Sequence, residues 1–173
     1  MPLNKYAPQV ATHRRTQSAI LEATKALIAT TGLKKMSMIE IADASEVSRA
    51  TLYNHYRDKE SVLLALCESE LARLVEIAQK APDATTALEQ ISLQVSSDSA
   101  LAAMRIQDPD QLTLALTKHD DHLWKAFAIA MTHLLGEGKS SLALRWILGQ
   151  ALHPINAQQS RAQAEAITGI ANL

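Results

Sequence analysis

The chain has 173 residues, with 17 Lys and Arg against 18 Asp and Glu, so its formal net charge is −1. This balance argues against a generally basic nucleic-acid-binding protein, and the single cysteine excludes an intramolecular disulfide and a multi-cysteine zinc site. No apolar run approaches the roughly 20 residues that a bilayer-spanning helix needs, and residues 1–15 lack the apolar core of a secretory signal. We therefore expect a cytoplasmic protein with no membrane partner.

The charges are unevenly distributed along the chain. Residues 1–60 hold nine Lys and Arg against six Asp and Glu, whereas residues 61–173 hold eight against twelve. A mildly basic N-terminal segment therefore precedes an acidic remainder. The asymmetry is small, and alone it is a weak indication of contact with DNA.

The composition predicts an all-α fold. Aromatic residues make up only 3% of the chain, Gly and Pro number five each, and no long stretch alternates β-branched or aromatic residues with polar ones. Residues 1–14 contain Pro2 and Pro8 and show no apolar periodicity. We expect a flexible N-terminal arm there.

The first two helices are predicted from apolar spacing and from capping residues. A helix is expected over about residues 15–31, followed by Gly32 at the position of a left-handed C-cap. Its apolar stripe is Ile20, Ala23, Leu27 and Ile28. Ser37 and Glu40 have the spacing of a capping box, which predicts a short second helix that ends near Ala44.

Two further N-caps and a set of separators divide the rest of the chain. Ser48 is expected to cap a third helix over about residues 49–56, and Asp58 a long fourth helix over 59–80. The apolar stripe of the fourth helix is Leu63, Leu66, Cys67, Leu71, Leu74, Val75 and Ala78, which predicts that the Cys67 thiol is buried. Later helices are expected over 84–96, 99–106, 109–118, 120–136, 140–152 and 157–171.

Residues 37–57 contain two short helices joined by residues 45–47. A connection this short makes the helices cross steeply, which is the geometry of a helix-turn-helix whose second helix can enter the DNA major groove. On a helical wheel, Leu52 and Tyr56 share the inward face of that second helix. The other side carries Arg49, Ala50, Tyr53, Asn54 and Arg57.

The side chains on the outer face suit contact with DNA. Arg49 and Asn54 can make paired hydrogen bonds to guanine and adenine edges, and the small Ala50 could meet a thymine methyl. Thr51, Tyr53 and His55 are donors of suitable length for phosphates. Lys59 lies in the first turn of the fourth helix, where free N–H groups and the helix dipole also favour phosphate.

The stretch from Arg15 to Leu66 resembles the tetracycline-repressor (TetR) family, most specifically over residues 47–60, Val-Ser-Arg-Ala-Thr-Leu-Tyr-Asn-His-Tyr-Arg-Asp-Lys-Glu. The resemblance implies a helix-turn-helix DNA-binding domain at 15–58 and a helical effector-binding and dimerisation domain at 59–173. The resemblance and the helical wheel together imply a set of DNA-binding residues: Ser37, Ser48, Arg49, Ala50, Thr51, Tyr53, Asn54, His55 and Lys59. The family usually has Gly where this chain has Glu46, so a left-handed turn there would cost about 1 kcal/mol.

The effector region is less sharply indicated. Candidate pocket residues are Met104, Arg105, Trp124, Phe127, Met131 and Trp146, each of which could instead lie in the core or at a dimer interface. A partly buried Arg105 would suit an anionic effector. The helices over 140–152 and 157–171 are apolar enough to form a dimer interface, with burial inside the monomer as the alternative.

These features predict a ligand-responsive repressor that binds a palindromic operator in double-stranded DNA as a homodimer. The alternative is a helical interaction module that has lost specific DNA binding, with Glu46 as the cause. No Gly-rich phosphate loop, nucleophile elbow or pair of catalytic carboxylates is present, so we expect no enzyme activity and no cofactor. His119 and His122 could present two metal ligands, but their spacing supplies no complete site, so no metal is expected.

Overall fold

The computed structural model describes residues 7–117 and 122–169, which form helices without any strand, as the composition predicts. These residues divide into two compact units, Met1–Cys67 and Glu68–Leu173. The helices are α1 Ala7–Thr31, α2 Met38–Ala44, α3 Arg49–His55, α4 Lys59–Lys80, α5 Ala84–Ser96, α6 Ser99–Gln107, α7 Pro109–Thr117, α8 His122–Leu135, α9 Glu137–Leu152 and α10 Ala157–Gly169. The boundary between the units falls inside α4, a turn or two beyond the start of that helix.

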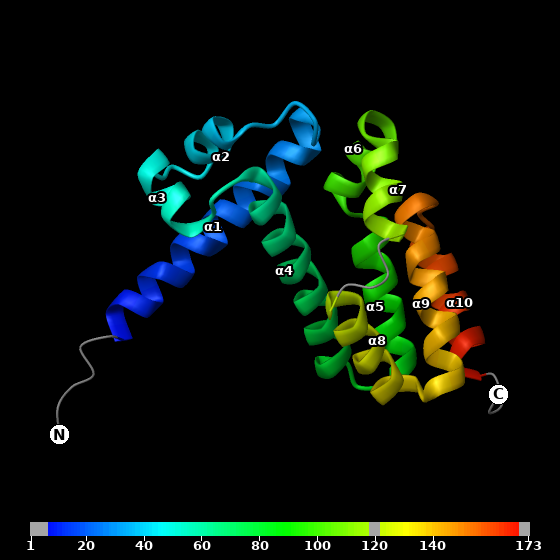
Figure 1. Cartoon of the computed structure of the whole chain (residues 1–173). Coiled ribbons are helices and arrows are strands. Elements are labelled where there is room, and N and C mark those ends of the chain that lie inside the picture. The colour runs from blue at the N-terminus through cyan, green and yellow to red at the C-terminus, as the bar shows by residue number, and fades with distance from the viewer. Residues whose placement is uncertain (1–6, 118–121, 170–173) are drawn as a thin grey trace, which may run out of the picture. The chain divides into compact units, whose positions relative to one another are not determined.

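In the first unit, α1 packs against α2, and α2 packs against α3 (Figure 1). The fully or almost fully buried side chains of this unit are Ile20, Thr24, Ile28, Met36, Ile41, Ala42, Leu52 and Val62. They come from all four of its helices and from the loop after α1. Burial of these side chains contributes most of the stability of the short helices α2 and α3, because isolated helices of one or two turns are not stable in water.

The N-terminal helix is longer than the sequence predicts. It begins at Ala7, so residues 7–14, expected to form part of an arm, are helical. Pro8 misled the prediction, because a proline in the first helical turn removes only an N–H that has no partner within the helix. The helix ends as expected: Gly32 has φ +87°, and its N–H donates to the carbonyl of Ile28 (3.2 Å).

The expectation for Cys67 is wrong, because its side chain is exposed. The buried residues of α4 are Val62, Leu66, Leu74 and Ala78, which follow one another at multiples of four residues. Cys67 lies one position beyond this row, on the solvent side of the apolar stripe. The predicted apolar stripe is wider than the buried row, because it includes Leu63 and Leu71, which flank the row and are only half-buried.

The second unit has a core shared by α4, α5, α8, α9 and α10. Helix α5 packs against α9 and α10, α8 packs against α9, and α6 pairs with α7 (Figure 1). The buried cluster is Leu74, Ala78, Leu88, Ile91, Val95, Phe127, Met131, Ala143, Ile147, Ala151, Ala164 and Ile167. Small residues on α9 and α10 let these two helices approach α5 closely.

A buried polar cluster links three helices of this unit. Ser92 on α5 donates to the hydroxyl of Ser160 on α10 (2.7 Å). The side-chain amide of Gln150 on α9 donates to the hydroxyls of Ser92 (2.7 Å) and Ser96 (3.1 Å). Ser92, Gln150 and Ser160 are buried, so each hydrogen bond replaces one to water that folding removes.

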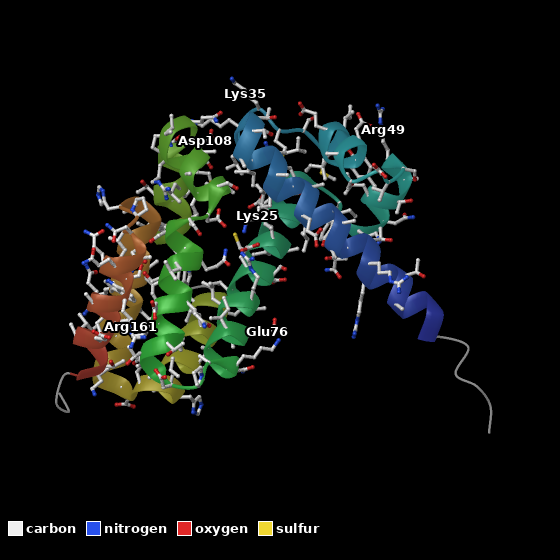
Figure 2. All side chains as sticks on the ribbon, turned by 180° about the vertical axis from the view of Figure 1, so that it is seen from behind. Lys25, Lys35, Arg49, Glu76, Asp108 and Arg161 are labelled. Atoms are coloured by element: carbon white, nitrogen blue, oxygen red, sulfur yellow. The ribbon has the colours of Figure 1, made fainter. Side chains whose placement is uncertain are left out.

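Two charged contacts reinforce the packing around α10. Arg161 donates to Glu89 on α5 (3.0 Å) and to Glu165 on its own helix (2.7 Å), and it lies on the outer side of α10 (Figure 2). Lys139, in the first turns of α9, donates to the carbonyl of Thr168 (3.0 Å) near the end of α10. A cation at this place satisfies a carbonyl that the helix itself leaves without a partner. Across the described part of the chain, no helix is both long and apolar enough to cross a membrane.

Candidate nucleic-acid interface

Two serines start the short helices of the first unit. Ser37 accepts from the N–H of Glu40 (3.3 Å), while its own N–H donates to the Glu40 carboxylate (2.8 Å). Ser48 accepts from the N–H of Thr51 (3.0 Å), and the hydroxyls of Ser48 and Thr51 are 2.8 Å apart. The capping box of α2 and the N-cap of α3 are thus confirmed, and both serines are exposed.

The turn between α2 and α3 is a Schellman motif with Glu46 in the left-handed conformation. Glu46 has φ +56°, a positive value that no other non-glycine residue shows among those the structure describes. Its N–H donates to the carbonyl of Asp43 (3.2 Å), and the N–H of Val47 donates to that of Ala42 (3.1 Å). This is the pair of bonds that defines the motif, which favours glycine at the position of Glu46. The predicted strain at Glu46 is therefore real.

Helix α3 has one buried and one exposed face, as the helical wheel predicts. Leu52 is fully buried and Tyr56, its C-cap residue, is almost so. On the opposite face, Arg49, Ala50 and Asn54 are exposed, and Tyr53 is 54% exposed although it is a large aromatic residue. The side chain of Arg49 points away from the helices of its unit (Figure 2).

His55 lies at the end of α3, against the N-terminal part of α1. Its ring stacks on that of His13, with the ring centroids 4.1 Å apart and the ring planes inclined by 21°. Partial burial lowers the pKa of His55, and the proximity of His13 lowers it further. His13 was not among the residues singled out in the sequence, because nothing local connects it to α3.

Lys59 is half-buried, and its ammonium group is held inside the first unit. It donates to the carbonyls of Leu33 (3.2 Å) and Met36 (3.0 Å), both in the loop that follows α1. These bonds fix that loop, and with it Ser37, against the start of α4. An ammonium group has three donors, so one of them is left for another acceptor.

The geometry combines a helix with a solvent-facing row formed by Arg49, Tyr53 and Asn54, a tight turn before it, and hydroxyl groups at two helix starts. The model of the bacterial regulatory proteins of the tetR family matches residues 20–66, which include α2, the turn and α3. Over residues 20–66 the chain is similar to the tetR-family regulators, which indicates a helix-turn-helix transcriptional regulator.

Comparisons with whole proteins extend beyond residues 20–66. The Fatty acid metabolism regulator protein of Bacillus subtilis (strain 168) is 24% identical over 130 residues, which are 70% of this chain and 67% of that protein. A solved Streptomyces coelicolor A3(2) structure, described as a transcriptional regulator, has a TM-score of 0.59 and 20% identity, over 90% of this chain and 99% of its own. The structure of the regulator FadR from Bacillus subtilis in complex with stearoyl-CoA has a TM-score of 0.54 and 17% identity, over 89% and 99% of the two chains. At these identities the structures show a shared fold.

The residues considered for an effector pocket fall in two places of the second unit. Phe127 (1% exposed) and Met131 belong to the buried cluster, and Trp124 packs edge-on against Phe127 with a centroid distance of 6.4 Å. Trp146 also borders the cluster, and its indole N–H donates to Gln163 on α10.

The other two candidates lie on α6. Met104 and Arg105 are half-buried, and Arg105 donates through Nη1 to the carbonyl of Ala151 on α9 (3.0 Å). Arg105 is thus partly engaged with a helix end. Of the histidines considered as metal ligands, His119 lies outside the described residues, and no group of three potential ligands occurs among the residues that were placed.

Helix α9 is covered by its own unit on one side only. Ala143, Ile147 and Ala151 are buried, whereas Leu142 (38% exposed) and Leu152 (42% exposed) face solvent. Burial inside the monomer is therefore confirmed for one face of this helix, and the dimer interface stays a prediction.

Proposed function

We propose that the chain is a ligand-responsive repressor that binds a palindromic operator as a homodimer. The observation that carries the proposal is the exposed row of Arg49, Tyr53 and Asn54 on a helix anchored from behind by Leu52. An exposed tyrosine beside an arginine and an asparagine, on the second helix of a helix-turn-helix, is what direct reading of bases requires. A regulator of this kind acts on DNA in the cytoplasm.

The individual contacts follow from where the side chains stand. Arg49 and Asn54 read base edges, and neither side chain has a hydrogen-bond partner among the described residues. Ala50 adjoins them and can meet a thymine methyl. The phosphate contacts are assigned to Ser37, Ser48, Thr51, Tyr53, His55 and Lys59. For Lys59 the assignment rests on the third ammonium donor, since the other two are bound to carbonyls.

The first test is selection from a random duplex library, followed by salt titration on the recovered sequence. A palindromic motif, bound with an affinity that falls steeply with salt, would support a dimeric reader of sequence. Arg49→Ala should then cost about 10- to 100-fold at one base pair and relax the preference there, as loss of a bidentate contact does. The matched control is Arg73→Ala, which removes an exposed arginine from α4. Weak binding without a motif would favour a helical interaction module instead.

The effector is assigned to the second unit, next to Trp124, Phe127, Met131 and Trp146, with Met104 and Arg105 as further contacts. A related FadR binds stearoyl-CoA, so long-chain acyl thioesters are the first compounds to test. Stearoyl-CoA should release the protein from its operator and change the fluorescence of the two tryptophans, while coenzyme A alone should do neither. Release by neither compound would redirect the search to other ligands.

The homodimer is assigned to the exposed face of α9, with α10 beside it. Leu142 and Leu152 are the exposed large apolar residues of that helix, and a partner that covers them would remove apolar surface from water. Sedimentation equilibrium should give a dimer, and Leu142→Glu should shift it toward monomer. Ile106→Glu, at an exposed position of α6, is the matched control. A monomer at all concentrations, or equal effects of the two variants, would exclude this face.

A further inference from the structure

The stacked rings of His13 and His55 form a unit that the tetR-family helix-turn-helix does not account for. We call these two residues the imidazole pair. It joins the last residue of α3 to a part of α1 that lies well before the helix-turn-helix in sequence. Neither ring has a hydrogen bond to another described residue, so the ring nitrogens are open to solvent or to a ligand. His13 is exposed and His55 is half-buried.

Two stacked imidazoles resist carrying two positive charges. Like charges at this separation disfavour each other, and partial burial disfavours a charge on His55 in addition. A charge on His55 is therefore less favourable in the free protein than on an ordinary histidine. A neutral imidazole offers one donor and one acceptor, whereas a protonated one offers two donors. A phosphate next to the pair would favour the protonated form by opposite charge and by hydrogen bonding.

Among the described residues, no carboxylate near the imidazole pair already supplies the negative charge that would favour its protonation. Asp58, the carboxylate in the loop after α3, accepts from the N–H of Ser61 (2.8 Å) and from Arg57 (2.9 Å). Lys59, at the start of α4, is bound to carbonyls. The adjoining segments of α1, α3 and α4 also carry the exposed side chains of Arg14, Arg15, Arg49 and Glu60. None of them contributes to the lowered pKa of His55, for which His13 is the charged partner.

We propose that the imidazole pair is a proton-linked binding site for a backbone phosphate of DNA, in which His13 and His55 bind the phosphate together after taking up one proton. The inference rests on the proposed binding of DNA and adds a contact from α1 and a dependence on pH. The proton comes from solvent, and no bond to phosphorus forms or breaks. His13 thus extends the interface beyond the helix-turn-helix.

Linkage sets the expected size of the effect. The pair holds its proton more tightly in the complex than in the free protein, so affinity for DNA rises as pH falls through the range around the ordinary histidine pKa of about 6.5. One proton taken up on binding gives about a tenfold gain in affinity per pH unit within that range. Above it neither state is protonated, and the affinity no longer changes with pH.

The experiment measures binding to the duplex recovered by selection, and to a mixed-sequence duplex of the same length, between pH 5.5 and 8.5 at constant ionic strength. It compares the native chain with His13→Phe, which keeps a ring against His55 but cannot titrate, and with His13→Gln. The control is His153→Gln, an exposed histidine after α9. Calorimetry in buffers of different ionisation enthalpy counts the protons taken up. NMR titration of the free protein follows both rings without DNA.

We expect the native chain and His153→Gln to take up at most one proton and to gain affinity as pH falls through the range around 6.5, by up to about tenfold per pH unit. Both His13 variants should lose most of this dependence and bind more weakly at pH 6. Binding with the same pH dependence in all variants would overturn the imidazole pair and leave the proposed function intact. Absence of DNA binding at every pH would overturn both. Independent titration of the two rings in the free protein would also contradict the pair.

Discussion

The left-handed residue in the turn allows a quantitative test. Replacing Glu46 with Gly keeps the Schellman hydrogen bonds, which are made by backbone atoms, and removes the Cβ that makes φ +56° unfavourable. The left-handed conformation costs an L-residue about 1–2 kcal/mol, and the greater freedom of Gly in the unfolded chain offsets about 0.4–1 kcal/mol. We therefore expect a net stabilisation of the first unit by about 0.5–1 kcal/mol.

The assay must separate the two units. Both tryptophans lie in Glu68–Leu173, so tryptophan fluorescence follows the second unit, whereas amide hydrogen exchange of peptides from α2 and α3 follows the first. For a domain of this size, each kcal/mol shifts the unfolding midpoint by about 4–8 °C, which corresponds here to a rise of about 2–8 °C. Exchange in α2 and α3 should slow by about two- to fivefold, with the second unit unchanged.

Glu46→Ala is the matched control, because it removes the carboxylate and keeps the Cβ. It should not stabilise the turn, although it should share with Glu46→Gly any gain in DNA affinity that comes from removing a negative charge. An equal stabilisation by Ala and Gly would refute the strain argument and assign the effect to charge. A loss of stability in Glu46→Gly would mean that the turn is held by contacts of the glutamate side chain.

Three further predictions concern neighbouring groups. Ser48→Ala should destabilise the first unit by about 1 kcal/mol in chemical unfolding, because α3 loses its N-cap, and Ser48→Asp should restore it. Lys59→Met should speed amide hydrogen exchange in the loop after α1, because it removes the hydrogen bonds to that loop. It should also reduce the slope of log affinity for DNA against log salt concentration by about one unit. An unchanged slope would mean that Lys59 has a structural role only. Hydrogen bonds from Ser61 lower the pKa of Asp58, so the stability they confer is present above the unfolded pKa of about 3.9 and is lost as pH falls through the folded value. Asp58→Asn should therefore weaken the pH dependence of the free energy of unfolding below about pH 4. The same pH dependence in the native chain and in Asp58→Asn would contradict this role of Asp58.

Features that depend on neighbouring residues in the chain were predictable from the sequence. The capping box of Ser37 and Glu40, the C-cap at Gly32 and the left-handed Glu46 each involve hydrogen bonds that span at most five residues. The inward position of Leu52 follows from helical periodicity alone. These rules also predict the exposed face of α3, which is the proposed base-reading face, because it lies opposite the buried side.

Features that depend on distant contacts were not predictable in this way. The carbonyls that hold the ammonium of Lys59 are 26 and 23 residues away in sequence, and they engage a side chain whose spacing suggested only a phosphate contact. The stack of His13 on His55 could form because α1 starts at Ala7, which the proline at position 8 obscured. The exposure of Cys67 was not predicted, because the buried stripe of α4 is narrower than its sequence suggests.

The buried cluster of Ser92, Gln150 and Ser160 has a consequence for how this protein can evolve. Each of the three helices contributes one polar group, and loss of any one leaves a buried hydroxyl or amide without its partner. Single replacements by apolar residues are therefore disfavoured, although a simultaneous change of all three to well-packed apolar side chains could be tolerated. Sequences with a mixture of polar and apolar residues at these three positions are less stable than the all-polar or the all-apolar set. Homologues should accordingly hold these positions as a set, polar together or apolar together.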